Sequence, residues 1–377
     1  MKKNMIAMAV AAAVAAPVAM ADTTLYGTAH ISADYIKGDD NNINVQSASS
    51  YFGIKGTERL SDSLSAIYQM EWGVNMTEGG DSFSSRNQFV GLKHNDVGTL
   101  IAGRHDTPMK LAISKHDLFG DQIGDNGNIV GNITGEIDID ILGFETIDSS
   151  AGWNLRTQNT IAYLTPDLNG FSAAIAWVAD HNRRLGLEDI DDFFDPRVND
   201  DNNDYDAWSL SASYNFEDIF TVTAAYEQHN INKRLARLAR AEGINLKDNE
   251  KSWLIGASAN VAGVKINALY QNIEDFGGYD SDVYGIGAAY TFGANTIKAQ
   301  YYYASLDKAL KAQNNGKNRK LTAVGYDYAL SKQTTVFAAY AWGNDGQSVW
   351  GDGHGGKAAV DPKDDNSAFS VGIRHKF

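Results

Sequence analysis

Apolar and polar residues alternate along short segments throughout the chain. In "LYGTAHISADYI", which begins at Leu25, one side carries Leu25, Ile31 and Tyr35, and the other carries His30 and Asp34. Successive side chains of a strand point to opposite faces, so this spacing predicts a strand with one apolar and one polar face. The last ten residues, "AFSVGIRHKF", follow the same pattern and end on an aromatic residue.

Sixteen such segments can be distinguished, and the connections between them are alternately short and long. "LSDS", "NDVG" and "TPDLNG" are typical of the short turns. All short turns therefore lie at one end of the predicted sheet and all long loops at the other. The predicted strands are residues 23–36, 49–60, 63–76, 84–95, 99–105, 154–165, 170–180, 206–216, 219–230, 251–261, 263–273, 281–292, 295–305, 319–329, 333–342 and 366–377.

Sixteen antiparallel strands in an open sheet would expose two unpaired edges, and closure into a barrel removes both. A barrel of this size is too wide for side chains to fill, so its polar faces line water and its apolar faces point outward into lipid. We therefore expect an all-β protein, a 16-stranded antiparallel transmembrane β-barrel whose last strand pairs with the first. Phe377 would then lie at the inner interface. A soluble two-sheet sandwich is the alternative, but its loops would not separate so strictly by length.

The first 21 residues resemble an export signal in composition. Lys2 and Lys3 precede an alanine-rich apolar stretch that ends in Ala19-Met20-Ala21. A basic start, an apolar middle and a small-residue exit are typical of a secretory signal peptide. A membrane anchor is the other interpretation, but a proline interrupts the stretch and no basic residues follow it. We expect residues 1–21 to be removed and residues 22–377 to form a single barrel domain.

Composition narrows the classes of function. The formal net charge is -15, and removal of Lys2 and Lys3 makes it -17, which disfavours nucleic acid as a partner. There is no cysteine, which excludes disulfide scaffolds, thiolate metal sites and cysteine catalysis. The 18 tyrosines cluster at the ends of predicted strands, as in the aromatic girdles of membrane barrels.

The motifs of common enzymes are absent from the sequence. "GDGHGG" (351–356) matches a dinucleotide-binding pattern, but no predicted helix follows it. The eight histidines form no H-E-x-x-H motif, and no G-x-S-x-G motif is present. We therefore expect no enzymatic activity and no cofactor. An outer-membrane barrel protease or phospholipase is the less favoured class.

Four stretches carry a family resemblance. They are "SSYFGIKGTERL" (49–60), "SSRNQFVGLKHNDVGTLIAGRHDTP" (84–108), "YDYALSKQTTVFAAYAW" (326–342) and the final "VGIRHKF". Together they resemble the general diffusion porins of Gram-negative bacteria, of both enteric and neisserial types. The resemblance implies an outer-membrane homotrimer of barrels with short periplasmic turns and long extracellular loops, through which small hydrophilic solutes and ions diffuse. It also implies an infolded third loop that narrows the pore, and the longest predicted loop, about 106–153, is the third.

The resemblance further implies basic residues on the barrel wall that face acids on the third loop. Arg86 and Arg156 fall where the family carries wall arginines, whereas Tyr51 and Thr28 fall where relatives carry basic residues. Lys55 shares the polar face of the second strand with Tyr51, so we expect it beside the arginines. Because two positive charges are missing and the chain is acidic, we expect a mild preference for cations.

The first half of the third loop supplies the expected acids. Asp117, Asp121 and Asp125 lie in "HDLFGDQIGDN", where the family's constriction acids lie. Opposite charges held across a narrow aqueous slit make a transverse field that orients water and dipolar solutes. His30, on the polar face of the first strand, is expected to line the lumen rather than to act as a metal ligand.

A substrate-specific porin, for example one for chito-oligosaccharides, is the alternative within the channel class. Trp153 and Phe144 could begin a line of aromatic rings that stack on sugars, although aromatic residues at such a junction are more often packing residues.

Two further segments leave alternatives open. Residues 187–206 carry nine acids, which can bind Mg²⁺ or Ca²⁺ through carboxylate oxygens or can simply be solvated. Residues 232–243 form a basic stretch with Leu235 and Leu238 on one helical side. This stretch predicts a short helix that lies near lipopolysaccharide phosphates or over the pore mouth, or that packs without a role. The other expected partners are outer-membrane lipid and the barrel-assembly machinery, which would bind the C-terminal strand.

Overall fold

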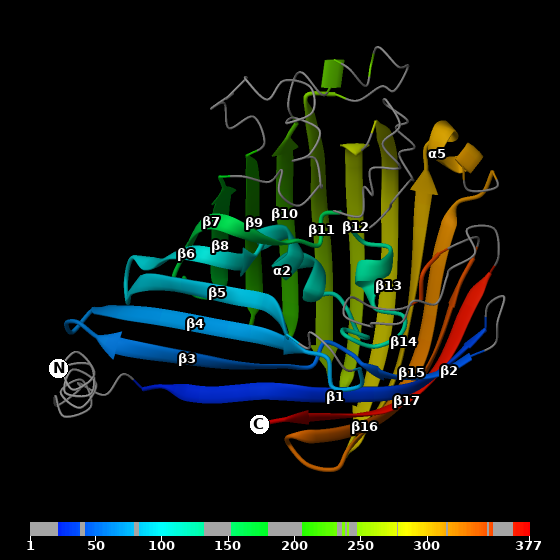
Figure 1. Cartoon of the computed structure of the whole chain (residues 1–377), viewed down its shortest axis with the longest axis horizontal. Coiled ribbons are helices and arrows are strands. Elements are labelled where there is room, and N and C mark those ends of the chain that lie inside the picture. The colour runs from blue at the N-terminus through cyan, green and yellow to red at the C-terminus, as the bar shows by residue number, and fades with distance from the viewer. Residues whose placement is uncertain are drawn as a thin grey trace, which may run out of the picture.

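One antiparallel sheet closes on itself and forms the body of the protein (Figure 1). The computed structural model describes residues 22–37, 42–78, 83–131, 152–179, 206–231, 236–237, 240, 247–276, 278–313, 316–344, 347–349 and 365–377. The strands are β1 (Thr24–Lys37), β2 (Asn42–Ser47), β3 (Tyr51–Arg59), β4 (Leu64–Val74), β5 (Phe83–His94), β6 (Gly98–Asp106), β7 (Arg156–Leu164), β8 (Phe171–Val178), β9 (Ala207–Phe216), β10 (Phe220–Asn230), β11 (Asn249–Val261), β12 (Val264–Phe276), β13 (Tyr279–Phe292), β14 (Asn295–Leu306), β15 (Arg319–Ala329), β16 (Thr334–Gly343) and β17 (Asn366–Lys376).

The barrel has sixteen strands because β2 and β3 are two parts of one. β2 pairs with the second half of β1 and β3 with its first half, and the chain between them bends at Ser49, whose φ is 53°. β17 pairs with the other side of β1, from Thr28 opposite Lys376 to Lys37 opposite Ser367. The predicted closure of the barrel by its last strand is confirmed. The sequence pattern missed β2, because the bend interrupts the alternation.

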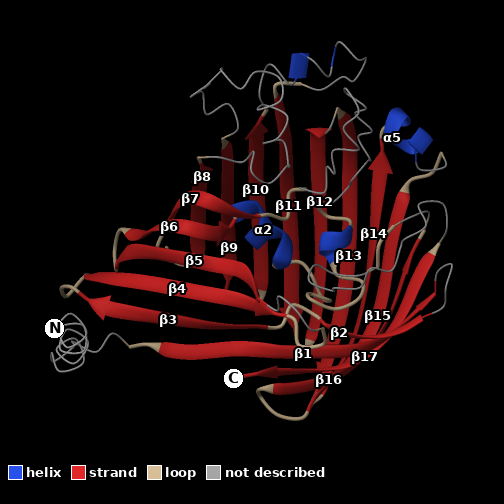
Figure 2. Ribbon diagram, in the orientation of Figure 1, coloured by secondary structure: helices blue, strands red, loops and turns tan. Residues whose placement is uncertain are grey.

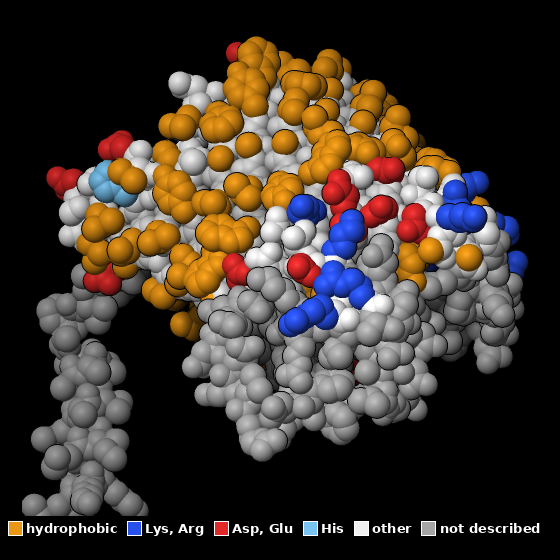
Figure 3. Space-filling model, turned by 90° about the horizontal axis from the view of Figure 1, so that it is seen from above, with side chains coloured by type: hydrophobic (Ala, Val, Ile, Leu, Met, Phe, Trp, Pro, Cys, Tyr) orange, Lys and Arg blue, Asp and Glu red, His pale blue; other side chains and the backbone are white. Residues whose placement is uncertain are grey.

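Large apolar side chains cover the outward side of the strands. Tyr226 pairs with Trp253 and Ala224 with Ile255, and both Trp253 and Ile255 are more than two fifths exposed. Hydrophobic side chains gather in the same way over the barrel wall in Figure 3. An apolar surface of this extent is stable only when something other than water covers it, and on a closed barrel that covering is lipid.

The connection between β6 and β7 is called loop three here, and its described residues, 107–131 and 152–155, enter the barrel and include two short helices. They are α2 (Pro108–Ser114) and the 3₁₀ turn η1 (Asn126–Asn128). α2 begins where Thr107 accepts a hydrogen bond from the Lys110 amide at 3.2 Å and Pro108 supplies the first helical residue. Figure 2 shows α2 inside the ring of strands and a second helix, α5 (Lys308–Gln313), at its rim. Neither helix was predicted, and among the described residues no helix has the length and apolar content to cross a membrane.

The core of the protein lies between loop three and the far wall of the barrel. Loop three contributes Met109, Ile113, Phe119, Ile123 and Ile129, which have no exposed surface. They pack against inward side chains of β11 to β16, which are Leu254, Leu269, Ile273, Val283, Leu321, Ala323, Ala339 and Ala341. The expectation that the whole inner face is polar is therefore wrong for this wall, because the loop and not water covers it.

Candidate pore constriction

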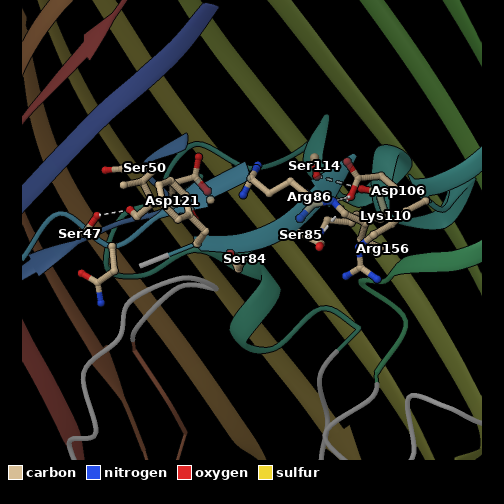
Figure 4. A pocket seen from close by; sticks show the side chains of 16 residues that line it. Ser47, Ser50, Ser84, Ser85, Arg86, Asp106, Lys110, Ser114, Asp121 and Arg156 are labelled. Carbon is tan, nitrogen blue, oxygen red and sulfur yellow. Dashed lines mark hydrogen bonds and ion pairs between the residues drawn. The ribbon is translucent and has the colours of Figure 1, made fainter. Parts of the chain in front are cut away.

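A cavity of about 580 Å³ remains on the side of loop three that the apolar core does not occupy (Figure 4). Its lining comes from the end of β2, from the bend before β3, from β4 to β7 and from loop three. The lining is polar, with hydroxyl groups and charges of both signs. The basic residues are Arg86, Arg104, Lys110 and Arg156, the acids are Asp106 and Asp121, and the serines are Ser47, Ser49, Ser50, Ser84, Ser85 and Ser114.

Asp106 holds two of the basic side chains at one end of the cavity. Its Oδ1 lies 3.0 Å from Nε of Arg156 and 3.9 Å from Nζ of Lys110. Asn87 accepts a hydrogen bond from Nε of Arg156 at 3.0 Å and donates one to Asp106 at 2.9 Å. The strand ends at Asp106 and the helix α2 begins two residues later, so the transition from wall to loop fixes this cluster. Arg156, which the sequence predicts on the barrel wall, is the first residue of β7 and lines this cavity.

Arg86 enters the cavity because β5 carries a bulge. Met70 pairs with Gln88 but Trp72 pairs with Ser85, so Arg86 and Asn87 together lie opposite Glu71. A bulge of this kind turns two neighbouring side chains to the same face of a sheet. Nε of Arg86 lies 3.8 Å from Oε2 of Glu71.

The Tyr51 ring packs against the guanidinium of Arg86. The guanidinium lies 4.7 Å from the centre of the Tyr51 ring, within the range of a cation–π contact. Glu71 in turn accepts a hydrogen bond from the Tyr26 hydroxyl at 2.8 Å. Tyr51, which stands where relatives carry a basic residue, therefore orients a neighbouring arginine instead of supplying charge itself.

Arg104 lines the same cavity, and the sequence analysis missed it. Leu100 and Ala102 face outward, so strict alternation assigns Arg104 to the apolar face. The register between β6 and β7 shifts between Gly103 and His105, and the alternation breaks there. Among the described residues no carboxylate lies within 4 Å of the Arg104 guanidinium, and its buried Nε has no hydrogen-bond partner.

Of the three loop acids predicted to face the arginines, Asp121 lines the cavity, whereas Asp117 and Asp125 do not. Asp121 has φ 61°, a left-handed conformation, and its amide donates to Oδ2 of Asp125 at 2.8 Å. Oδ1 of Asp125 accepts from the Gly127 amide at 2.6 Å, and Oδ1 of Asp117 accepts from the Phe119 amide at 2.9 Å. The structure thus uses Asp117 and Asp125 to hold the turn that presents Asp121.

Burial raises the pKa of the Asp117 carboxyl above its usual value. It raises the pKa of Asp125 further, because the charges of Asp117 and Asp121 lie close by. The His116 ring, on the same stretch of loop three, is buried against Gly256 of β11, and burial lowers its pKa to about 4.

Lys55, Thr28 and His30 lie outside the cavity lining. Lys55 is exposed, with Nζ 4.7 Å from the centre of the Tyr26 ring. Thr28 is buried opposite Tyr51 in the pairing of β1 with β3. The His30 ring is 1% exposed and packs edge-on against Phe337 at 5.2 Å. His30 is therefore part of the packed wall near β16 and not of an open lumen.

Trp153 has no exposed surface and stacks on the ring of His229 at 4.2 Å. It therefore offers no face to a solute. Four predicted features lie outside the described residues: Phe144, the segment 187–205, residues 1–21 and most of the basic stretch 232–243. Within the ranges that are described, no group of three or more histidines and carboxylates is placed to bind a metal ion.

The chain is similar to known channel proteins over its whole length. The family model described as "Gram-negative porin" matches residues 7–348. "Outer membrane porin protein 32" of Delftia acidovorans is 27% identical, and the alignment covers 100% of both chains.

Solved structures share the fold. "Anion-selective porin from Comamonas acidovorans" superposes with a TM-score of 0.73 at 21% identity, over 95% of this chain and 100% of the other. The trimer form of OmpT of Vibrio cholerae superposes with a TM-score of 0.58 at 14% identity, over 94% of this chain and 99% of the other. The chain belongs to the Gram-negative porin family, and it is a β-barrel channel protein of the outer membrane.

Proposed function

We propose that small hydrophilic solutes and ions diffuse passively through the cavity between loop three and β4 to β7. The observation that carries this proposal is a cavity of about 580 Å³, lined by hydroxyl and charged groups, inside a barrel whose outer face is apolar. Such a pore has no need of a conformational cycle or of an energy source.

Liposome swelling tests this proposal directly. Liposomes that contain the purified protein should swell in isotonic solutions of small sugars, and the rate should fall as the sugar becomes larger than the cavity. Protein-free liposomes are the control. Liposomes that swell no faster with the protein than without it would contradict passive diffusion.

Within this function we propose a preference for anions. The sequence expectation of a mild cation preference rested on the missing charges at Thr28 and Tyr51. The cavity contains two basic residues which that argument did not include, Arg104 and Lys110. Four basic residues then face two acids, with Glu71 beside Arg86, so the local charge is positive although the whole chain is acidic. Local charge at the narrowest point sets ion preference in channels, and one structural relative is described as anion-selective.

A substrate-specific channel and an enzyme are weaker proposals. The aromatic line expected for sugar binding would have begun at Trp153, which is buried against His229. Release of an entrapped dye from proteoliposomes without hydrolysis of lipid or peptide would separate a channel from a barrel enzyme. Sugar-dependent blockage of single-channel current would favour the specific channel over general diffusion.

We also propose a path of export and assembly. Residues 1–21 are removed as a signal peptide, the C-terminal strand is bound by the barrel-assembly machinery, and three copies assemble in contact with lipopolysaccharide. The trimer is supported by a solved structural relative described as a trimer. N-terminal sequencing should begin at Asp22, and channel closure in three equal steps would indicate three pores in one assembly.

A further inference from the structure

Three inward side chains of β14, spaced two residues apart, reach loop three. Nζ of Lys298 donates to Oε1 of Gln122 at 2.7 Å, and the Tyr302 hydroxyl donates to the His116 carbonyl at 3.1 Å. Gln300 lies between them. Every second residue of a strand faces the same side, so β14 presents a column of polar groups to the loop.

Gln300 makes more hydrogen bonds to loop three than Lys298 or Tyr302 does. Its Oε1 accepts from the Leu118 amide at 3.0 Å. Its Nε2 donates to Oδ1 of Asp117 at 2.9 Å and to the Gly124 carbonyl at 2.8 Å. Asp121, the loop acid that lines the cavity, lies between these attachment points. One side chain therefore holds both arms of the turn that presents Asp121.

Glycines on three other strands make room for the same stretch of loop. A Cβ atom on Gly256 of β11 would lie 2.4 Å from the His116 ring, and one on Gly287 of β13 would lie 2.9 Å from Cδ1 of Leu118. A Cβ on Gly325 of β15 would lie 2.8 Å from the Phe119 ring. Such distances are too short for packed atoms, so a larger residue at Gly256 or Gly325 must displace the ring of His116 or Phe119. At Gly287 the added atom would also meet Oδ1 of Asn267 on the neighbouring strand, at 2.3 Å.

We propose that Gly256, Gly287, Gln300 and Gly325 form a seat that fixes the position of loop three and thereby the width and charge of the constriction. Gln300 is a positioning residue, because it is 3% exposed and does not line the cavity. It acts through Asp121, which it holds at a set distance from the basic wall. The proposal rests on the proposed channel function for its electrical readout, but not for its structural one.

Substitution Gln300→Met tests the seat, because methionine keeps the length of the side chain and removes all three hydrogen bonds. We expect a folded barrel with noisier open-channel current and a shifted reversal potential. Gln228→Met is the matched control, since the hydrogen bonds of Gln228 within the described residues go to Tyr226 and Asn230 of its own strand. A folded Gln300→Met variant with wild-type noise and reversal potential would overturn the proposal.

Hydrogen exchange of the Leu118 amide gives a readout that does not depend on current. It should accelerate in Gln300→Met and stay at the wild-type rate in Gln228→Met. A wild-type protein that conducts no ions would contradict the proposed channel function. If the Leu118 exchange still responds as expected, the proposal that the seat fixes loop three remains supported. An unchanged exchange rate of the Leu118 amide in Gln300→Met would contradict the proposal that the seat fixes loop three.

Gly256→Val is a second variant that does not require Gln300 to change. The added methyl groups should push His116, and with it the loop, toward the cavity, so that the open-channel conductance falls. Ala257→Val, on the outward side of the same strand, should keep the wild-type conductance. A Gly256→Val barrel that conducts like the wild type would contradict the role of the glycines.

Discussion

Gly27 and Phe377 exchange two backbone hydrogen bonds. The Gly27 amide donates to the Phe377 carbonyl at 3.0 Å, and the Phe377 amide donates to the Gly27 carbonyl at 3.1 Å. The last residue of the chain thus extends the pairing of β17 with β1 by one position. The Phe377 ring lies over Gly27, where it occupies the space that a side chain would take. The aromatic terminus closes the barrel and covers the start of its first strand.

This relationship predicts that Gly27→Val weakens the closure. A Cβ on Gly27 would lie 2.5 Å from the Phe377 ring and 2.6 Å from the Tyr51 carbonyl oxygen. Forcing extra atoms into such a contact costs about 1–3 kcal/mol of unfolding free energy. Urea unfolding in detergent micelles would measure the loss. Ala29→Val, at the next outward position of the same strand, should unfold close to the wild-type midpoint, and equal midpoints for both variants would refute the argument.

The barrel could be predicted from the sequence because alternation is a local property of each strand. The residues in "LYGTAHISADYI" need only their own spacing to reveal a strand with two faces. Arg104 could not be assigned in this way, because the register shift that breaks its alternation arises from pairing with β7. Asp117 and Asp125 differ from Asp121 in the folded loop, where they accept loop amides and, for Asp117, the Gln300 side chain, although all three are loop acids at equal spacing. A pattern in sequence cannot tell an acid that faces water from one that accepts loop amides.

Lys298 and Asp327 form an ion pair inside the barrel that should be strongly coupled. Nζ of Lys298 lies 2.9 Å from Oδ2 of Asp327, and the two side chains are 5% and 18% exposed. Lys298→Met leaves the carboxylate without its partner, which should cost about 3 kcal/mol of unfolding free energy. The double variant Lys298→Met/Asp327→Asn should be more stable than Lys298→Met alone. Additive losses in this double-mutant cycle would show that the pair is not coupled.

The buried ring of His116 predicts a pH dependence of stability. Its pKa is about 4 in the folded loop and 6.5 in an unfolded chain. The unfolded chain therefore binds the extra proton first, so the contribution of His116 is fully present above pH 6.5 and is lost as the pH falls toward 4. The loss at pH 5 is about 2 kcal/mol. Asp117 and Asp125 act in the opposite sense, because their pKa values are raised in the loop and they favour the folded state as the pH falls toward 3.8.

His116→Gln separates the two effects, since it leaves both carboxyl groups in place. The difference in unfolding free energy between the wild type and this variant should shrink between pH 7.5 and pH 5 by about 2 kcal/mol. Urea unfolding at the two pH values measures it. A difference that does not change with pH would mean that the ring titrates normally in the folded protein.

Arg104 should contribute to ion preference more clearly than its paired neighbours. No described carboxylate neutralises it within 4 Å, whereas Arg156 lies 3.0 Å from Asp106. Arg104→Gln should therefore move the reversal potential in a salt gradient toward that of a cation-preferring pore. Lys332→Gln, in the short turn between β15 and β16, removes the same charge far from the cavity and should leave the reversal potential unchanged. Equal shifts in both variants would indicate that only the overall charge of the protein matters.

The reversal potential of the wild-type protein in a planar bilayer under a potassium chloride gradient tests the central claim most directly. A cavity with four basic and two acidic residues predicts a steady conductance whose zero-current potential lies on the chloride side of zero. A potential on the potassium side would contradict the assignment of the pore to this cavity. A bilayer that shows no conductance steps would contradict the channel itself.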